Sequence, residues 1–85
     1  IVPYEVFAVS DGHVILAIGN DNQFAKFCDF AKKNWAQDER FRTNKSRVLN
    51  RAALIPLVRE LMLSKTKTQW LNGLEPLGVP CGPIN

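Results

Sequence analysis

The first 18 residues have the pattern of two short strands joined by a tight turn. Residues 4–9 and 13–18 are rich in β-branched and aromatic side chains, which favour extended backbone. Ser10, Asp11 and Gly12 lie between them, and an Asp-Gly pair suits the positive φ angles of a hairpin turn. We therefore predict an antiparallel β-hairpin. Residues 14–18 are apolar without alternation, so we expect the second strand to be covered on both faces.

A helix is predicted next, from Asn20 to about Lys33. Asn20 can cap the free amides at its start while Gln23 reaches back in a capping-box arrangement. The helical spacing defines one apolar stripe, made of Phe24, Phe27, Cys28 and Ala31. We expect this stripe to pack on the hairpin.

A longer helix is predicted after a surface connection at residues 35–43, which Trp35 and Phe41 should pin to the core. Asn44 is the expected cap. The apolar face of this helix comprises Val48, Ala52, Ile55, Val58 and Met62, with Leu54 and Leu61 beside them. Pro56 removes an amide donor and clashes with the carbonyl of Ala52, so we predict a kink or break there.

A last short helix should begin at Thr66, where Thr66 and Gln69 repeat the capping pattern. Pro76 strains its final turn, and Gly78 can adopt the left-handed conformation that ends a helix. Residues 79–84 then form a stiff extended tail. The predicted fold is a single α+β domain over residues 1–85, an N-terminal antiparallel hairpin packed against three helices with an extended C-terminal tail.

Composition narrows the class of protein. The chain has 46% hydrophobic and 22% charged residues, an ordinary globular balance, and its net charge of +3 names no partner. No apolar run approaches the length of a membrane span, and no secretory signal is visible, so we expect neither a membrane partner nor export. The first residues read as starting inside a longer protein. Two distant cysteines favour reduced thiols in the cytoplasm over a disulfide.

The residue types that could carry chemistry are few. His13 is the only histidine and reads as an exposed strand residue, and Cys28 lies on the apolar stripe as a core residue. Cys81 is flanked by Pro and Gly pairs, which suits either a segment lining a pocket or a rigid exit from a helix.

Basic residues accompany the long helix and read as a solvated face, although a nucleic-acid surface is the alternative. They are Lys45, Arg47, Arg51, Arg59, Lys65 and Lys67.

Several short sequence motifs follow one another in a characteristic order along the whole chain. They are Val2-Pro3-Tyr4-Glu5-Val6-Phe7, Asp11-Gly12-His13-Val14, Gly19-Asn20-Asp21 with Gln23-Phe24, Arg40-Phe41-x-Thr43-Asn44, Arg47 with Asn50-Arg51 and Leu54, Trp70-Leu71, and Gly78-Val79-Pro80-Cys81-Gly82-Pro83. Together they resemble the class III CoA transferases, the group of formyl-CoA transferase and carnitine CoA transferase.

The resemblance implies the small domain of such an enzyme. In that family an aspartate of a large domain attacks an acyl-CoA thioester to give a mixed anhydride, and most CoA-binding basic residues also lie there. Neither aligns to this chain, so we expect no catalytic residue, no bound cofactor and no activity of the chain alone. The large CoA-binding domain is the implied partner. The residues expected nearest the acyl group are Gly78, Val79, Pro80, Cys81, Gly82 and Pro83.

A second interpretation is a stand-alone binding module that uses a borrowed domain of this kind. In that case an apolar face of the hairpin, left without cover, would favour a homodimer. This segment does not identify the acyl group or the acceptor that the parent enzyme uses, because the pocket residues that select them lie outside it.

Overall fold

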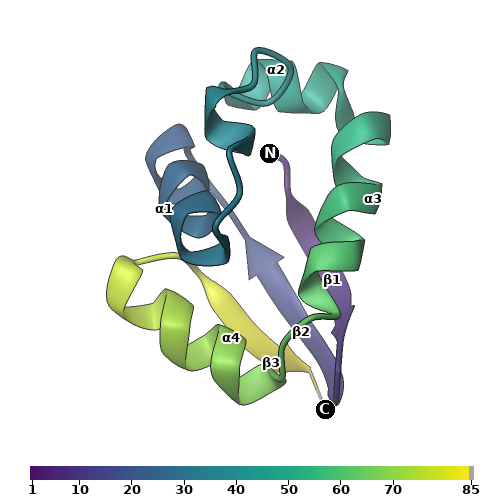
Figure 1. Ribbon diagram of the computed structural model, residues 1–85, viewed down its shortest axis with the longest axis vertical. Helices are drawn as coiled ribbons and strands as arrows, with labels where there is room; N and C mark the ends of the chain where they lie inside the picture. Colours follow the sequence, from purple (N-terminus) through teal and green to yellow (C-terminus); the bar gives the residue numbers. More distant parts are fainter. Residues whose placement is uncertain (85) are drawn as a thin grey trace.

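The chain folds into a three-stranded antiparallel sheet and four α-helices, as the computed structural model describes for residues 1–84 (Figure 1). Strands β1 (Tyr4–Val9) and β2 (Gly12–Ala17) form the predicted hairpin. A third strand, β3 (Cys81–Ile84), pairs antiparallel with the other edge of β2, which gives the order β1-β2-β3. The predicted fold class is confirmed, and the expected tail is in fact part of the sheet.

The hairpin turn consists of Ser10 and Asp11, because Val9 and Gly12 are paired across the two strands. Gly12 has a φ of 154°, a conformation that side chains disfavour, which explains glycine at this position. Two hydrogen bonds attach the turn to the start of the last helix. The Ser10 amide donates to the Lys65 carbonyl at 3.0 Å, and the Lys67 amide donates to Asp11 Oδ1 at 2.8 Å.

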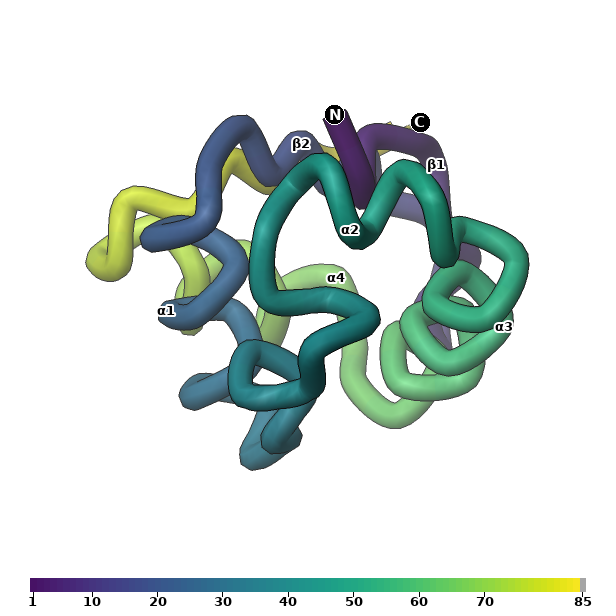
Figure 2. Tube along the Cα trace, turned by 90° about the horizontal axis from the view of Figure 1, so that it is seen from above, coloured from purple at the N-terminus to yellow at the C-terminus, as the bar shows by residue number. Residues whose placement is uncertain are grey.

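The helices all lie on one side of the sheet, as Figure 2 shows from above, with the strands at the top and the helices below. They are α1 (Asp21–Ala31), α2 (Asn44–Leu49), α3 (Arg51–Met62) and α4 (Lys67–Leu74), with short 3-10 turns η1 (Trp35–Gln37) and η2 (Glu75–Leu77). The result is a two-layer arrangement in which one face of the sheet has no helix on it.

Two of the predicted helix starts are confirmed. Asn20 Oδ1 accepts from the Gln23 amide at 2.8 Å, and Gln23 Oε1 accepts from the amide of Gly19, one residue before the expected one. Thr66 and Gln69 form the complete capping box of α4. Helix α1 ends at Ala31, before Lys33, because Lys32 adopts a left-handed conformation with φ 59°.

The predicted cap at Asn44 is wrong, because Thr43 takes that position and accepts from the Ser46 amide. Of the kink or break predicted at Pro56, the break is wrong, because α3 runs through this residue. The helix breaks at Asn50, whose backbone leaves helical geometry and whose Nδ2 donates to the carbonyls of Arg40 and Ser46. Pro56 lies inside α3 beside exposed Ala52, where water can hydrate the carbonyl that lacks a donor.

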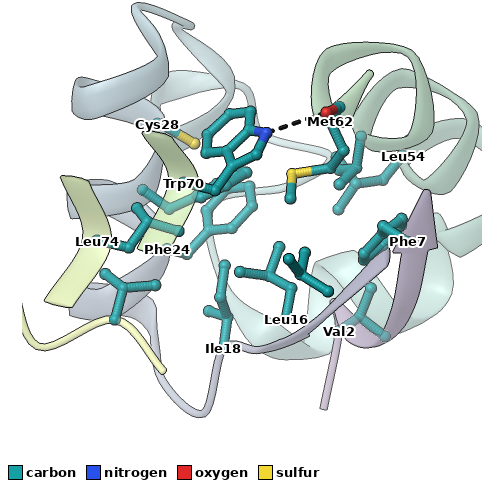
Figure 3. Close-up of a cluster of buried hydrophobic side chains, with 14 of the residues drawn as sticks. Val2, Phe7, Leu16, Ile18, Phe24, Cys28, Leu54, Met62, Trp70 and Leu74 are labelled. Carbon is teal, nitrogen blue, oxygen red and sulfur yellow. Dashed lines mark hydrogen bonds between the residues drawn. The ribbon is translucent and has the colours of Figure 1, made fainter. Parts of the chain in front are cut away.

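The core lies between the sheet and the helices (Figure 3). Val14, Leu16 and Ile18 of the hairpin are fully buried against the α1 stripe and α4. The indole Nε1 of Trp70 donates to the Met62 carbonyl at 3.0 Å, which joins the end of α3 to α4. Within residues 1–84, no buried side-chain nitrogen or oxygen lacks a hydrogen-bond partner.

Several packing predictions can be compared with this core. Cys28 and Phe41 are fully buried and Trp35 is partly buried against the core, as expected. Val48 and Ala52 are exposed, so the predicted stripe is wrong at these two positions. The break at Asn50 places Val48 on α2, apart from the face of α3 that carries Leu54, Ile55, Val58 and Met62, and Ala52 lies in the exposed first turn of α3.

The expectation that β2 is covered on both faces is wrong within the described chain. Ile15 and Ala17 remain partly exposed on the face that no helix covers. None of the helices formed by residues 1–84 is both long enough and apolar enough to cross a membrane.

Candidate functional site

Residues 78–83 run from the end of η2 onto the edge of the sheet. Gly78 has a φ of 73°, the left-handed conformation predicted for it, and a Cβ there would meet nothing within 4 Å. Glycine is therefore favoured by backbone conformation and not by lack of space. The Gly78 carbonyl accepts from Gln23 Nε2 at 3.3 Å, which ties this corner to α1.

The segment beyond Gly78 is fixed by backbone hydrogen bonds. The amide of buried Val79 donates to the Leu74 carbonyl at 3.2 Å, and the Pro80 carbonyl accepts from the Ala17 amide at 3.0 Å. Cys81, Gly82 and Pro83 then lie opposite Leu16, Ile15 and Val14 of β2. Two prolines limit the freedom of this backbone further. The segment is thus a rigid edge of the domain.

A surface groove of about 680 Å³ lies between this segment and the last helix. Leu71, Asn72 and Glu75 form its helical wall. Five of the six predicted site residues form the other wall, namely Gly78, Val79, Pro80, Cys81 and Pro83. Gly82 is the exception, because it lies opposite Ile15, and a Cβ there would come within 3.4 Å of Ile15 Cγ2. The rigid segment therefore also lines a hollow.

The groove does not contain an activated thiol. Burial raises the pKa of Cys81 to about 11, so its thiol is protonated near neutral pH. Burial raises the pKa of Cys28 further, to about 12, against the opposing effects of a backbone hydrogen bond from Ala36 and the charge of Arg47. Both cysteines are free. The groove can supply shape and apolar contact, with Asn72 and Glu75 as its polar groups.

The other candidates for chemistry lie apart from the groove. His13 is exposed on β2, as predicted, opposite Ala8 and Ile84. In the part of the chain that the structure describes, His, Cys, Asp and Glu side chains do not gather in threes in a way that could hold a metal ion.

Arg47 has a role that the sequence did not reveal. It was expected on a solvated face, but its side chain is fully buried, so that expectation is wrong. Nε donates to the Val2 carbonyl at 2.7 Å, Nη1 to the Phe41 carbonyl at 2.9 Å, and Nη2 to Asp21 Oδ1 at 2.9 Å. Its guanidinium also lies 4.3 Å from the centre of the Phe24 ring. Arg47 joins the N-terminal segment, α1 and α2 in one junction.

Asn44 completes that junction. Its side-chain Oδ1 accepts from the backbone amide of Val2 at 3.0 Å, and its backbone amide donates to Asp21 Oδ1 at 2.8 Å. The only signal in the sequence was the position of Arg47 in the motif set, since its helical spacing indicated a surface residue. Arg51 and Arg59 instead face Glu5 of β1, with nitrogen-to-oxygen distances of 3.5 and 3.9 Å. Arg47 is therefore removed from the predicted basic face by burial, and Arg51 and Arg59 are partly neutralised by Glu5, which weakens the case for a nucleic-acid interface.

Comparison with known proteins identifies the family to which this chain belongs. The sequence model of CoA-transferase family III matches residues 1–85. The succinate–glutarate CoA-transferase of Agrobacterium fabrum is 41% identical over 100% of this chain, which covers 22% of that protein. The human succinyl-CoA:glutarate CoA-transferase is 37% identical, with 20% of its length covered.

A solved structure gives the same answer. A CaiB/BaiF family protein from Brucella suis superimposes with a TM-score of 0.94 at 46% identity, over 100% of this chain and 23% of that one. The chain belongs to CoA-transferase family III. It spans about a fifth of the length of the relatives that it matches.

Proposed function

We propose that this chain is the small domain of a family III CoA-transferase, in which it forms one wall beside the acyl end of a CoA thioester. The observation that carries the proposal is the match along all 85 residues to enzymes of which this segment is about a fifth. The wall would be the groove side formed by Gly78, Val79, Pro80, Cys81 and Pro83.

The rest of the enzyme would supply the chemistry. Opening a thioester requires a nucleophile that is ionised and correctly placed. The aspartate that the resembled family uses does not align to this chain, and both thiols of the chain have raised pKa values. A rigid apolar wall can instead position an acyl group and exclude water. We therefore assign the catalytic residue and the main CoA contacts to the large domain, and expect the isolated chain to be inactive. The free thiols of Cys28 and Cys81 support a cytoplasmic location.

A domain exchange tests the proposal. The corresponding segment of the Agrobacterium succinate–glutarate CoA-transferase is replaced by these 85 residues, and transfer of CoA between succinate and glutarate is measured. We expect activity within about tenfold of the unmodified enzyme, a change in barrier of about 1.4 kcal/mol. The isolated chain is the control, with no transfer above the uncatalysed rate.

Two results would contradict this function. The first is a chimera that has native circular dichroism and a cooperative melt but transfers no CoA. The second is transfer at an enzymatic rate by the isolated chain, because this would place a complete active site within it.

A further inference from the structure

The face of the sheet opposite the helices is apolar, although nothing in residues 1–84 covers it. Its side chains are adjacent through the strand register, in which Tyr4 pairs with Ala17, Val6 with Ile15, and His13 with both Ala8 and Ile84. This face, here called the outer face, consists of Tyr4, Val6, Ala8, His13, Ile15, Ala17, Gly82 and Ile84.

The outer face lacks the charged residues that water-facing strands normally carry, and its polar groups are those of Tyr4 and His13. An antiparallel sheet with one solvated face usually alternates apolar and polar side chains along each strand. Here the outer face contains no Lys, Arg, Asp or Glu, although these make up 22% of the chain. Tyr4 is 54% and Val6 49% exposed. The residue pattern is that of a buried sheet face, which explains why residues 14–18 are apolar without alternation.

The positions of the two chain ends indicate where the rest of a longer protein would lie with respect to the outer face. Figure 2 shows the N-terminal end at the level of the strands, where Val2 bonds to Asn44 and Arg47 of α2. The last described residues, Cys81–Ile84, are strand β3 itself. The segment that matches this chain makes up only 20–23% of the relatives, so in those proteins most of the polypeptide lies outside it. Polypeptide that continues from either end would begin beside the sheet.

We propose that the outer face is the docking surface for the rest of the family III CoA-transferase, and that the docked surface is itself apolar and uncharged. This inference rests on the proposed function. In this arrangement the large domain covers the face of β2 that the helices do not cover. The groove beside α4 lies on a different side of β3 from the docked surface. Docking on the outer face would hold β3, and with it the wall of the groove, in place against the large domain.

Cysteine labelling in the chimera tests this interface without relying on activity. Val6→Cys is placed on the outer face, and Val48→Cys on α2 is the control, since the two valines are 49% and 48% exposed. Maleimide labelling is followed by peptide mass spectrometry in the chimera and in the isolated chain. We expect Val6→Cys to react at least about tenfold more slowly in the chimera, because labelling would require opening of the interface, while Val48→Cys reacts equally in both.

A second pair guards against a variant that does not fold. Tyr4→Cys lies on the outer face and Leu63→Cys at the end of α3, and both native side chains are 54% exposed. Protection of Tyr4→Cys but not Leu63→Cys supports the proposal in the same way.

The outcomes separate this inference from the proposed function. An active chimera in which both outer-face cysteines label freely would overturn the inference and leave the function standing. An inactive chimera with both protected would support the docking surface and contradict the function. Protection already in the isolated chain, with a dimer in sedimentation, would assign the outer face to a second copy of this chain and overturn the proposal.

Discussion

The two faces of the small sheet carry similar side chains in different surroundings. Val14 and Leu16 point toward the helices and are fully buried, whereas Ile15, between them, is partly exposed on the outer face. The apolar character of a residue therefore does not tell which face holds this domain together. The contacts of the helix-side face stabilise these 85 residues, while the outer face can contribute only once another surface covers it.

The strongest test of this comparison is a pair of neighbouring substitutions in β2. Leu16→Ala should lower the free energy of unfolding by about 2–5 kcal/mol, because it leaves a cavity in a filled core. Ile15→Ala should cost less than about 1.5 kcal/mol in the isolated chain, since the side chain is already partly hydrated. Urea unfolding measures both. Equal losses would show that the two faces do not differ.

The Arg47 junction tests whether the helix-side layer depends on a buried polar centre. Arg47→Met should destabilise the chain by about 2–4 kcal/mol, because the Val2 and Phe41 carbonyls lose buried donors. The control is Arg51→Met, whose half-exposed ion pair with Glu5 should contribute less than about 1 kcal/mol. Chemical unfolding compares the two, and a smaller loss for Arg47→Met than for Arg51→Met would contradict this account.

The edge that lines the groove can be tested at Gly78. Gly78→Ala should cost about 1–2 kcal/mol, because its φ of 73° is unfavourable for a residue with a Cβ. Gly78→Asn should cost less, since asparagine tolerates the left-handed region. Because a Cβ at this position meets no neighbour, a steric explanation is not available. Thermal melts rank the variants, and equal stability of all three proteins would contradict this assignment.

The cap of α4 should give a smaller effect. Thr66→Ala removes the side chain that accepts from the Gln69 amide, and a loss of about 1 kcal/mol is expected. Thr68→Ala, at an exposed position inside the same helix, is the matched control and should be near neutral or slightly stabilising. The difference between the two melting curves is the measurement, and its absence would mean that the cap is not needed.

The last prediction concerns the reactivity of the Cys81 thiol and requires no substitution. Because burial raises the pKa of Cys81 to about 11, its alkylation by iodoacetamide at pH 8 should be on the order of a hundredfold slower than that of a free thiol. The rate should rise as pH approaches 11, since the thiolate is the reacting form. Buried Cys28, with a pKa of about 12, should react more slowly still. Rapid alkylation of native Cys81 at neutral pH would contradict this assignment.

The local signals of the sequence were sufficient for the elements that depend on neighbouring residues. The hairpin at Asp11-Gly12, the caps at Asn20 and Thr66, and the left-handed Gly78 are all confirmed, because each depends on hydrogen bonds or backbone angles within a few residues. Five of the six residues expected near the acyl group line the groove, whereas Gly82 lies on the outer face and the helical wall of Leu71, Asn72 and Glu75 was not predicted.

Only the tertiary structure decided the features that join distant segments. Helical spacing placed Arg47 at the surface, but its partners Val2 and Asp21 are 45 and 26 positions away, and spacing carries no information about them. The same holds for residues 81–84, which pair with β2 although nothing local marks them as a strand, and for the break at Asn50, which bonds to Arg40. The sequence determined that β2 is apolar on both sides, and the fold determined which of those sides the helices cover, because this depends on where the chain returns to the sheet.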